Sequence, residues 1–263
     1  MIFRFLSLAS GSSGNCYYLG TDSYGVLFDA GVGIRAVKKI LKENNIGLEQ
    51  IMAVFITHAH ADHIKCVGSL GEKYDIPVYA TELVHEGIRK QKLNISRKMI
   101  VEKEKPVMIR EFKITAFSVP HDANDCVGYL VDYNNIKWIL ATDIGHIDET
   151  VAKYIRLANH LVVEANYDMK MLVNGNYPNF LKARIMNGKG HLCNSETANF
   201  LAANFNSQLK NIWLCHLSKE NNRPEIACKT VEAALMQRGI HIGYDVNLAA
   251  LKRSNPSKMH LLS

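Results

Sequence analysis

Residues 52–63 read MAVFITHAHADH, and this stretch decides both the fold and the chemistry. The apolar residues 52–56 predict a buried β-strand, and metal-binding side chains follow it at once. His58 and His60 stand two apart in an extended chain, so their imidazoles project from one side and can chelate one ion. Asp62 and His63 come as the chain turns into a helix, from where they can reach a second ion. Imidazole and carboxylate suit zinc and manganese, so the stretch predicts a pair of divalent ions.

Three more candidate ligands follow apolar strands further along the chain. They are His121 in ITAFSVPH, Asp143 in WILATD and His216 in NIWLCH. Functional side chains often lie on loops at the ends of strands. Each residue alone is more often an ordinary polar residue at a strand end, but the histidine motif at 57–63 favours a role as a ligand.

The composition is that of a soluble globular protein, with 48% hydrophobic and 21% charged residues. The net charge of +6 is only a weak indication of an anionic partner. The six cysteines form no C-x-x-C pair, which predicts reduced thiols and a cytoplasmic location. No apolar stretch approaches the roughly 18 residues of a membrane span. Because no linker or repeat is present, we expect a single domain over 1–263.

Short apolar strands alternate with helical stretches, and hairpins are mixed in. This pattern predicts an α+β fold with two sheets between outer helices. A tight hairpin is expected at Asn134-Asn135, whose side chains tolerate positive φ. The predicted strands are 2–9, 16–20, 25–29, 52–56, 77–80, 112–119, 127–133, 136–142, 160–165 and 211–215. The predicted helices are 33–44, 63–74, 81–91, 147–157, 194–206 (with Asn194 and Ser195 as its N-cap) and 224–237.

The D-A-G that begins at Asp29, the H-A-H-A-D-H motif, His121, the T-D-I-G aspartate and His216 occur in a familiar order. It is the order of the five motifs of the metallo-β-lactamase fold superfamily, which the chain resembles over nearly its whole length. The resemblance implies a four-layer αββα sandwich with metals at one edge. A histidine at position 60, where iron-dependent redox members usually have a glutamate, favours hydrolysis.

The same resemblance implies a role for each candidate ligand. A metal-bound hydroxide would be the nucleophile, and Asp29 would orient the ligand loop without touching a metal. Asp143 would bridge the two ions. The first ion would be held by His58, His60 and His121, and the second by Asp62, His63 and His216.

Two residues outside these motifs indicate phosphodiester chemistry. Glu164 ends a strand in LVVE, and His191 stands just before a helix in GHLCNSETANFLAA. The pair resembles the nuclease branch of the superfamily, in which the glutamate orients a histidine that protonates the leaving oxygen. A carboxylate that is hydrogen-bonded to an imidazole fixes the tautomer of the imidazole and raises the pKa of the imidazole. Asp62, Glu164 and His191 are the predicted catalytic residues.

Further motifs resemble the YycJ/WalJ-type subgroup, whose members are regarded as 5′→3′ exonucleases of DNA. They are SGSSGNCYYL at 10–19, EANYD at 164–168, GHL at 190–192 and HLSKENNRPE at 216–225. Too few positions separate Asp143 from His216 in the sequence for the large β-CASP cap of RNA-processing nucleases to lie between them. No glycine-rich arm like that of tRNA 3′-processing enzymes is found. Both departures weaken an RNA-specific function.

The nucleic acid itself is expected to bind at two places. Asn194 and Ser195, with the backbone N–H groups of a helix start, would seat a phosphate, although a simple helix cap has the same sequence. The basic segment 167–189 contains Tyr177, Lys182 and Arg184, a combination of charge and aromatic character that suits single strands.

Two other classes of function stay open at this stage. A small-molecule metallohydrolase, such as a cyclic phosphodiesterase or a thioesterase, would use the same metals. A regulatory binding protein with a vestigial site is the other, but the complete set of candidate ligands argues against it.

Overall fold

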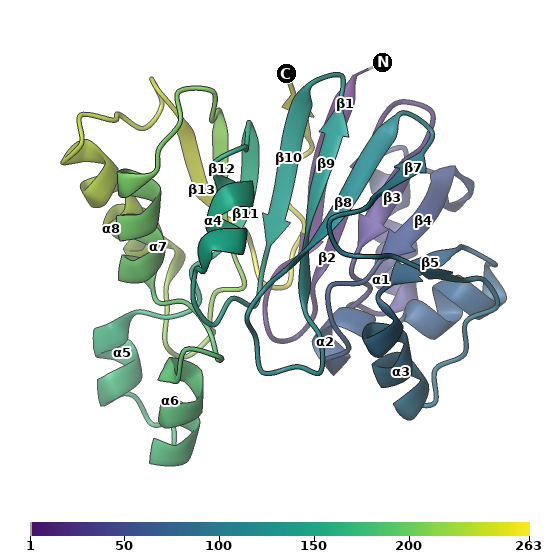
Figure 1. Ribbon diagram of the computed structural model, residues 1–263, viewed down its shortest axis with the longest axis horizontal. Coiled ribbons are helices and arrows are strands. Elements are labelled where there is room, and N and C mark those ends of the chain that lie inside the picture. The colour runs from purple at the N-terminus through teal and green to yellow at the C-terminus, as the bar shows by residue number, and fades with distance from the viewer. Residues whose placement is uncertain (1) are drawn as a thin grey trace. The chain divides into compact units, whose positions relative to one another are not determined.

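The computed structural model describes residues 2–263, which divide into two compact units (Figure 1). The first unit comprises residues 2–116, 123–127 and 252–263, and the second comprises 117–122 and 128–251. Each unit has its own mixed sheet and its own helices, which confirms the expected α+β class. The single-domain organisation stays a prediction.

The sheet of the first unit has the strand order β14-β1-β2-β3-β4-β5-β6. Its neighbours from β14 to β3 pair antiparallel, whereas those from β3 to β6 pair parallel. The strands are β1 (Phe3–Ala9), β2 (Cys16–Gly20), β3 (Gly25–Phe28), β4 (Ile51–Phe55), β5 (Val78–Ala80), β6 (Lys98–Ile100) and β14 (His260–Leu262). Because β3 and β4 are parallel, the loops that carry Asp29 and the histidine motif leave the sheet at the same edge.

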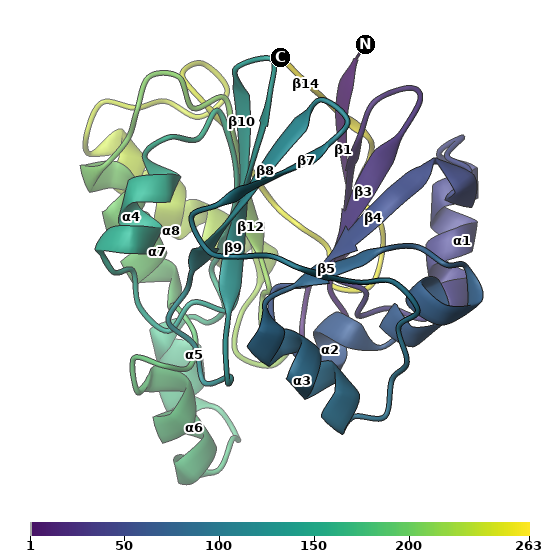
Figure 2. The same ribbon diagram turned by 45° about the vertical axis from the view of Figure 1, so that its right-hand side comes forward.

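Alternating side chains of this sheet fill two apolar layers. On one face, Val37 and Leu41 of α1 (Ile34–Glu43) are buried with Val84 and Ile88 of α3 (Glu82–Lys90). Figure 2 shows α1 alongside β3 and β4. The other face is aromatic, and the ring of Phe55 stacks on those of Phe28 and Tyr79 with centroids 5.5 and 4.8 Å apart. The hairpin of β7 (Pro106–Ile109) and β8 (Phe112–Ser118) places Phe112 against Phe3.

Within the second unit the strand order is β13-β12-β11-β10-β9. The strands are β9 (Val127–Tyr133), β10 (Ile136–Ala141), β11 (His160–Glu164), β12 (Asn211–Cys215) and β13 (Asn247–Ala250). Strands β9 and β10 form the expected hairpin, with φ of 51° at Asn134 and 65° at Asn135. The pairs from β10 to β13 are parallel, so the carboxyl ends of β10, β11 and β12 meet at one edge.

Five helices belong to the second unit. They are α4 (Glu149–Ile155), α5 (Met169–Asn174), α6 (Asn179–Met186), α7 (Asn194–Ala203) and α8 (Pro224–Met236). In both ribbon views α4, α7 and α8 lie along the same face of the sheet, and α5 and α6 lie together beyond its end. No helix among residues 2–263 has the length and apolar character needed to cross a membrane.

The ten predicted strands all form, with ends within one residue of those expected. The helix expected over 63–74 is wrong, because α2 (Ala61–Ile64) is separate from a π-helical turn at Ser69–Lys73. The expected N-cap is wrong as well, since Cys193 occupies that position in α7. Strands β6, β7, β13 and β14 and helices α5 and α6 were not predicted. Strand β6 is wholly exposed and α6 buries no residue, so neither has an apolar periodicity to detect.

Candidate metal centre

In the first unit a buried carboxylate organises the histidine motif from behind. The backbone N–H and the hydroxyl of Thr57 donate to Oδ1 of Asp29 over 2.9 and 3.0 Å. Oδ2 of Asp29 lies 2.7 Å from Nδ1 of His63, and both side chains are fully buried. An imidazole that donates Nδ1–H to a carboxylate keeps the lone pair of Nε2 for a metal. Asp29 therefore fixes the orientation of the His63 ring.

His58 and His60 converge as a chelating pair should. Nε2 of His58 and Nδ1 of His60 are 3.0 Å apart. Two nitrogens bound to one tetrahedral zinc ion at about 2.0–2.1 Å would be separated by roughly 3.3 Å. The two rings thus need only a small adjustment to share an ion, and the donor set of this loop fits a divalent metal.

Asn15 comes from a separate segment and contacts this loop, although the sequence did not single it out. Its backbone N–H donates to the carbonyl of Asp62 over 2.8 Å, and its Nδ2 lies 3.0 Å from Nε2 of His63. The same nitrogen is 3.4 Å from Oδ2 of Asp62, and the side chain is fully buried. Gly31 closes the loop from the other side, because a Cβ there would stand 1.6 Å from the Asp62 carbonyl oxygen. Only the SGSSGNC match at the N-terminus hinted at this role.

Three of the predicted site residues adopt a left-handed backbone conformation. Their φ angles are 60° at Asp29, 53° at Asp143 and 54° at His216, and each residue comes just after a strand. This region is uncommon for residues other than glycine, and each instance stores on the order of 1–3 kcal/mol. The surrounding hydrogen bonds must hold these turns in place, which is typical of functional sites.

In the second unit four of the predicted site residues come together, three at the ends of β10, β11 and β12 and one just before α7. Asp143, Glu164, His191 and His216 each offer one atom, and these atoms all lie within 4.8 Å of one another. Oδ1 of Asp143 lies 3.5 Å from Nδ1 of His216. It is 3.8 Å from Nε2 of His121, whose Nδ1–H donates to the carbonyl of Gly190 over 3.0 Å. This group of carboxylates and imidazoles also has the chemistry that a divalent metal requires.

Glu164 is the centre of this cluster. Its Oε1 lies 2.8 Å from Nδ1 of His191 and 3.0 Å from Nδ1 of His216. Its Oε2 accepts backbone N–H groups from Ile144 over 2.7 Å and from Leu192 over 3.2 Å. The carboxylate is fully buried, so its orientation is fixed by these four donors. One side chain thereby orients both a predicted metal ligand and the predicted proton donor.

Glu164 and His191 each stabilise the charged form of the other. Burial by itself would raise the pKa of Glu164, but the adjacent His191 and His216 imidazoles lower that pKa below its ordinary value. Burial would likewise lower the pKa of His191, but the Glu164 carboxylate outweighs it and raises the pKa. A carboxylate and an imidazole placed in this way form a hydrogen-bonded ion pair whenever the imidazole is protonated.

The residues expected to bind substrate are engaged within the second unit. Asn194 is buried and exchanges two hydrogen bonds with Asn222, so its amide is held within the fold. Ser195 beside it is exposed. Lys182 donates to the carbonyl of Val173 over 2.7 Å. Arg184 forms an ion pair with Asp122 at 2.6 Å. Tyr177 is half-buried and packs against the apolar cluster of Tyr167, Leu172 and Cys193.

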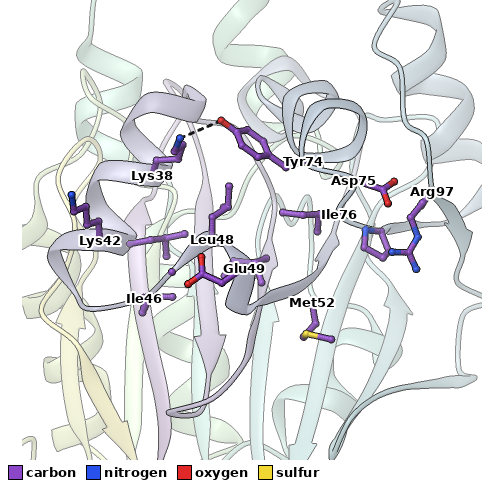
Figure 3. A pocket seen from close by; sticks show the side chains of 14 residues that line it. Lys38, Lys42, Ile46, Leu48, Glu49, Met52, Tyr74, Asp75, Ile76 and Arg97 are labelled. Carbon is purple, nitrogen blue, oxygen red and sulfur yellow. Dashed lines mark hydrogen bonds between the residues drawn. The ribbon is translucent and has the colours of Figure 1, made fainter.

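A pocket of about 740 Å³ in the first unit is separate from the histidine motif. Its lining includes Ile51 and Met52 at the start of β4, whereas the motif follows the end of that strand. Figure 3 shows Lys38 at the rim of this pocket with its hydrogen bond to the hydroxyl of Tyr74. The pocket has an aliphatic floor and contains none of the predicted site residues.

The model of the β-lactamase superfamily domain matches residues 24–208. The chain belongs to the β-lactamase superfamily. Exodeoxyribonuclease YycJ of Bacillus anthracis is 34% identical to it over 98% of this chain and 99% of its own length. Exodeoxyribonuclease WalJ of Streptococcus pneumoniae is 36% identical over 92% of both chains. Among solved structures, the metallo-β-lactamase fold protein YhfI of Bacillus subtilis aligns with a TM-score of 0.71 at 16% identity, covering 98% of this chain and 99% of its own.

These similarities confirm the fold and the class of enzyme that the sequence predicted. The chain has the metallo-β-lactamase fold, and its relatives include the YycJ/WalJ group that its motifs resemble. Together with the histidine and carboxylate clusters, membership of the superfamily makes this chain a metal-dependent hydrolase.

Proposed function

We propose that this β-lactamase superfamily member is a dinuclear phosphodiesterase that degrades DNA stepwise from a 5′ end. The observation that carries the proposal is the contact of Glu164 with both His191 and His216. The names of the two exodeoxyribonuclease relatives support DNA as the polymer. A cytoplasmic location belongs to the same proposal.

The two ions, zinc or manganese, would bind the seven candidate ligands in the family's arrangement. When bound, they supply Lewis acidity and lower the pKa of water to near neutrality. Asp143 would contact both ions. The remaining ligands would be His58, His60 and His121 for the first ion and Asp62, His63 and His216 for the second.

His191 would deliver a proton to the leaving oxygen. Its Nδ1 is occupied by Glu164, so Nε2 is the nitrogen that can donate to substrate. An alkoxide is a poor leaving group at neutral pH and needs this proton, whereas a thiolate does not. The pairing of His191 with Glu164 therefore favours a phosphodiester over a thioester. A small phosphodiester is the second candidate, because it would need the same proton.

A substrate panel tests the proposal. It would be run with zinc and with manganese on single- and double-stranded DNA, RNA, bis(p-nitrophenyl) phosphate and a thioester. We expect DNA to be degraded stepwise from a 5′-phosphorylated end while a closed circle persists. Rapid cutting of the circle would refute the exonuclease assignment, and turnover of the small diester alone would leave the second candidate.

Replacing the proton donor separates its role from metal binding. His191→Ala should retain both metals yet lose about 10²–10⁴-fold in the rate on DNA. The loss should be much smaller on bis(p-nitrophenyl) phosphate, whose p-nitrophenolate leaves without a proton. His241→Ala, at an exposed position of the same unit, is the control. Equal losses on both substrates would make His191 a residue that binds substrate or maintains the structure.

A further inference from the structure

Helices α5 and α6 and the turn after them, residues 169–189, lie together beyond the end of the second sheet. One side is packed, because Leu172, Tyr177 and Ile185 contact the buried Tyr167 and Cys193. The pair also exposes large apolar side chains, of which Phe180 is the most exposed at 76%. The other exposed members are Met169, Val173 and Met186. Several exposed apolar side chains within one short segment make it a candidate binding surface.

The charge of this helical pair is of one sign. Residues 169–189 contain four cationic side chains and no aspartate or glutamate. Lys182 and Arg184 have partners within the second unit, at Val173 and Asp122, and they hold the two helices in place. Lys170 and Lys189 are exposed. A surface that combines exposed apolar side chains with unopposed positive charge suits a polyanion that also carries flat apolar groups.

The helical pair is hydrogen-bonded to the candidate metal centre through the end of α6. The carbonyl of Ile185 accepts the backbone N–H of His191 over 3.1 Å, and the carbonyl of Gly190 accepts Nδ1–H of His121 over 3.0 Å. A Cβ at position 190 would stand 2.3 Å from the Ile185 oxygen, so this contact requires glycine. Phe180 lies five residues before Ile185, about 7.5 Å along the helix.

We infer that α5 and α6 form a platform for single-stranded nucleic acid, with Phe180 stacking on a base close to the reacting phosphate. The inference rests on the proposed function. Aromatic side chains with nearby cations are the standard means of holding single strands without sequence preference. Lys170 and Lys189 would neutralise phosphates, whereas Tyr177, half-buried in the apolar cluster, leaves the stacking role to Phe180.

The test compares strands that have bases with strands that lack them. The probes are a fluorescent thymidine strand and an abasic strand of equal length, both with cleavage-resistant phosphorothioate linkages. Binding to the metal-loaded enzyme is measured by anisotropy. Phe180→Ala should weaken binding of the thymidine strand by roughly 5- to 150-fold and leave the abasic strand unaffected. Phe180→Trp should retain binding of the thymidine strand, because indole stacks on a base as well as a phenyl ring does.

Tyr244→Ala, at a 90% exposed aromatic of the same unit, is the matched control and should change neither strand's affinity. Equal weakening of both strands by Phe180→Ala, or no weakening, would overturn the inference. A change in sedimentation instead of strand affinity would assign the patch to contact between copies of the chain. If the wild type hydrolyses the small diester but neither binds nor degrades nucleic acid, the proposed function itself fails. If it degrades DNA while Phe180→Ala behaves as wild type, only the platform is refuted.

Discussion

Glu164→Gln tests the central claim that one carboxylate orients two imidazoles. The substitution preserves volume, and Oε2 must still accept the N–H groups of Ile144 and Leu192. The amide oxygen is therefore expected at that position. The amide nitrogen then faces Nδ1 of His191 and of His216, where the carboxylate now stands at 2.8 and 3.0 Å.

A donor at that position reverses the ring tautomers. Both Nδ1 atoms must then accept a hydrogen bond, so the ring protons move to the Nε2 atoms. The protonated Nε2 of His216 then has no lone pair for a metal ion. Loss of such a supporting contact typically lowers metal affinity 10–100-fold, which is about 1.4–2.7 kcal/mol. The rate at saturating metal should fall by about 10²–10⁴-fold, because His191 also loses the carboxylate that stabilises its charged form.

Metal affinity would be measured by competition with a chromogenic chelator, and rates on DNA and on bis(p-nitrophenyl) phosphate. Glu149→Gln removes the same charge from a side chain that is 92% exposed, and it should behave as wild type. Unchanged affinity for both ions in Glu164→Gln would refute the orientation of His216. An unchanged rate on DNA as well would refute the whole assignment of Glu164.

Three further outcomes are expected. Asp143→Ala should bind fewer than the two metal equivalents expected of the wild type and lose turnover; full loading with full activity would exclude Asp143 as a bridging ligand. Asn15→Ala should lower Tm by roughly 2–10 °C, since it removes the buried side-chain hydrogen bonds to the backbone of Gly11, while the exposed Asn199→Ala should not; calorimetry would show this, and an unchanged Tm would mean that these hydrogen bonds do not stabilise the fold. Removal of the metal ions by a chelator should lower Tm by roughly 5–10 °C, because ions at 100 times their Kd stabilise the folded state by about 2.7 kcal/mol. Added metal should restore the original Tm. A Tm that does not respond to chelator would argue against a preformed metal site.

Much of the fold could be predicted from patterns within short stretches of the sequence. The strand at 52–56 is apolar throughout and the H-x-H-x-D-H motif follows it, so both could be recognised without knowing any neighbour in space. The asparagine hairpin after β9 was predictable for the same reason, since its positive φ angles depend on two adjacent residues. Strand β6 and helix α6 were missed because exposed elements carry no apolar periodicity.

The candidate ligands were likewise predicted from residue types that follow apolar strands. Glu164 and His191 were paired through their resemblance to the nuclease branch, and the structure places them 2.8 Å apart. What residue type could not reveal is that Glu164 also reaches His216. That contact depends on β11 and β12 lying side by side and parallel, which is a property of the sheet and not of either segment.

The sequence by itself determined which side chains are candidates for metal binding and which predicted strand each of them follows, because both depend on short local patterns. The tertiary structure alone decided how those side chains are held. Asn15 reaches His63 across 48 positions, and Asp29 reaches it across 34. The left-handed turns at Asp143 and His216 are supported by distant residues, since Glu164 accepts the N–H of Ile144 and Asn166 donates to the carbonyl of His216. Arg184 likewise acquired its partner Asp122 across 62 positions, because hydrogen bonds between remote segments arise only when packing has brought the segments together.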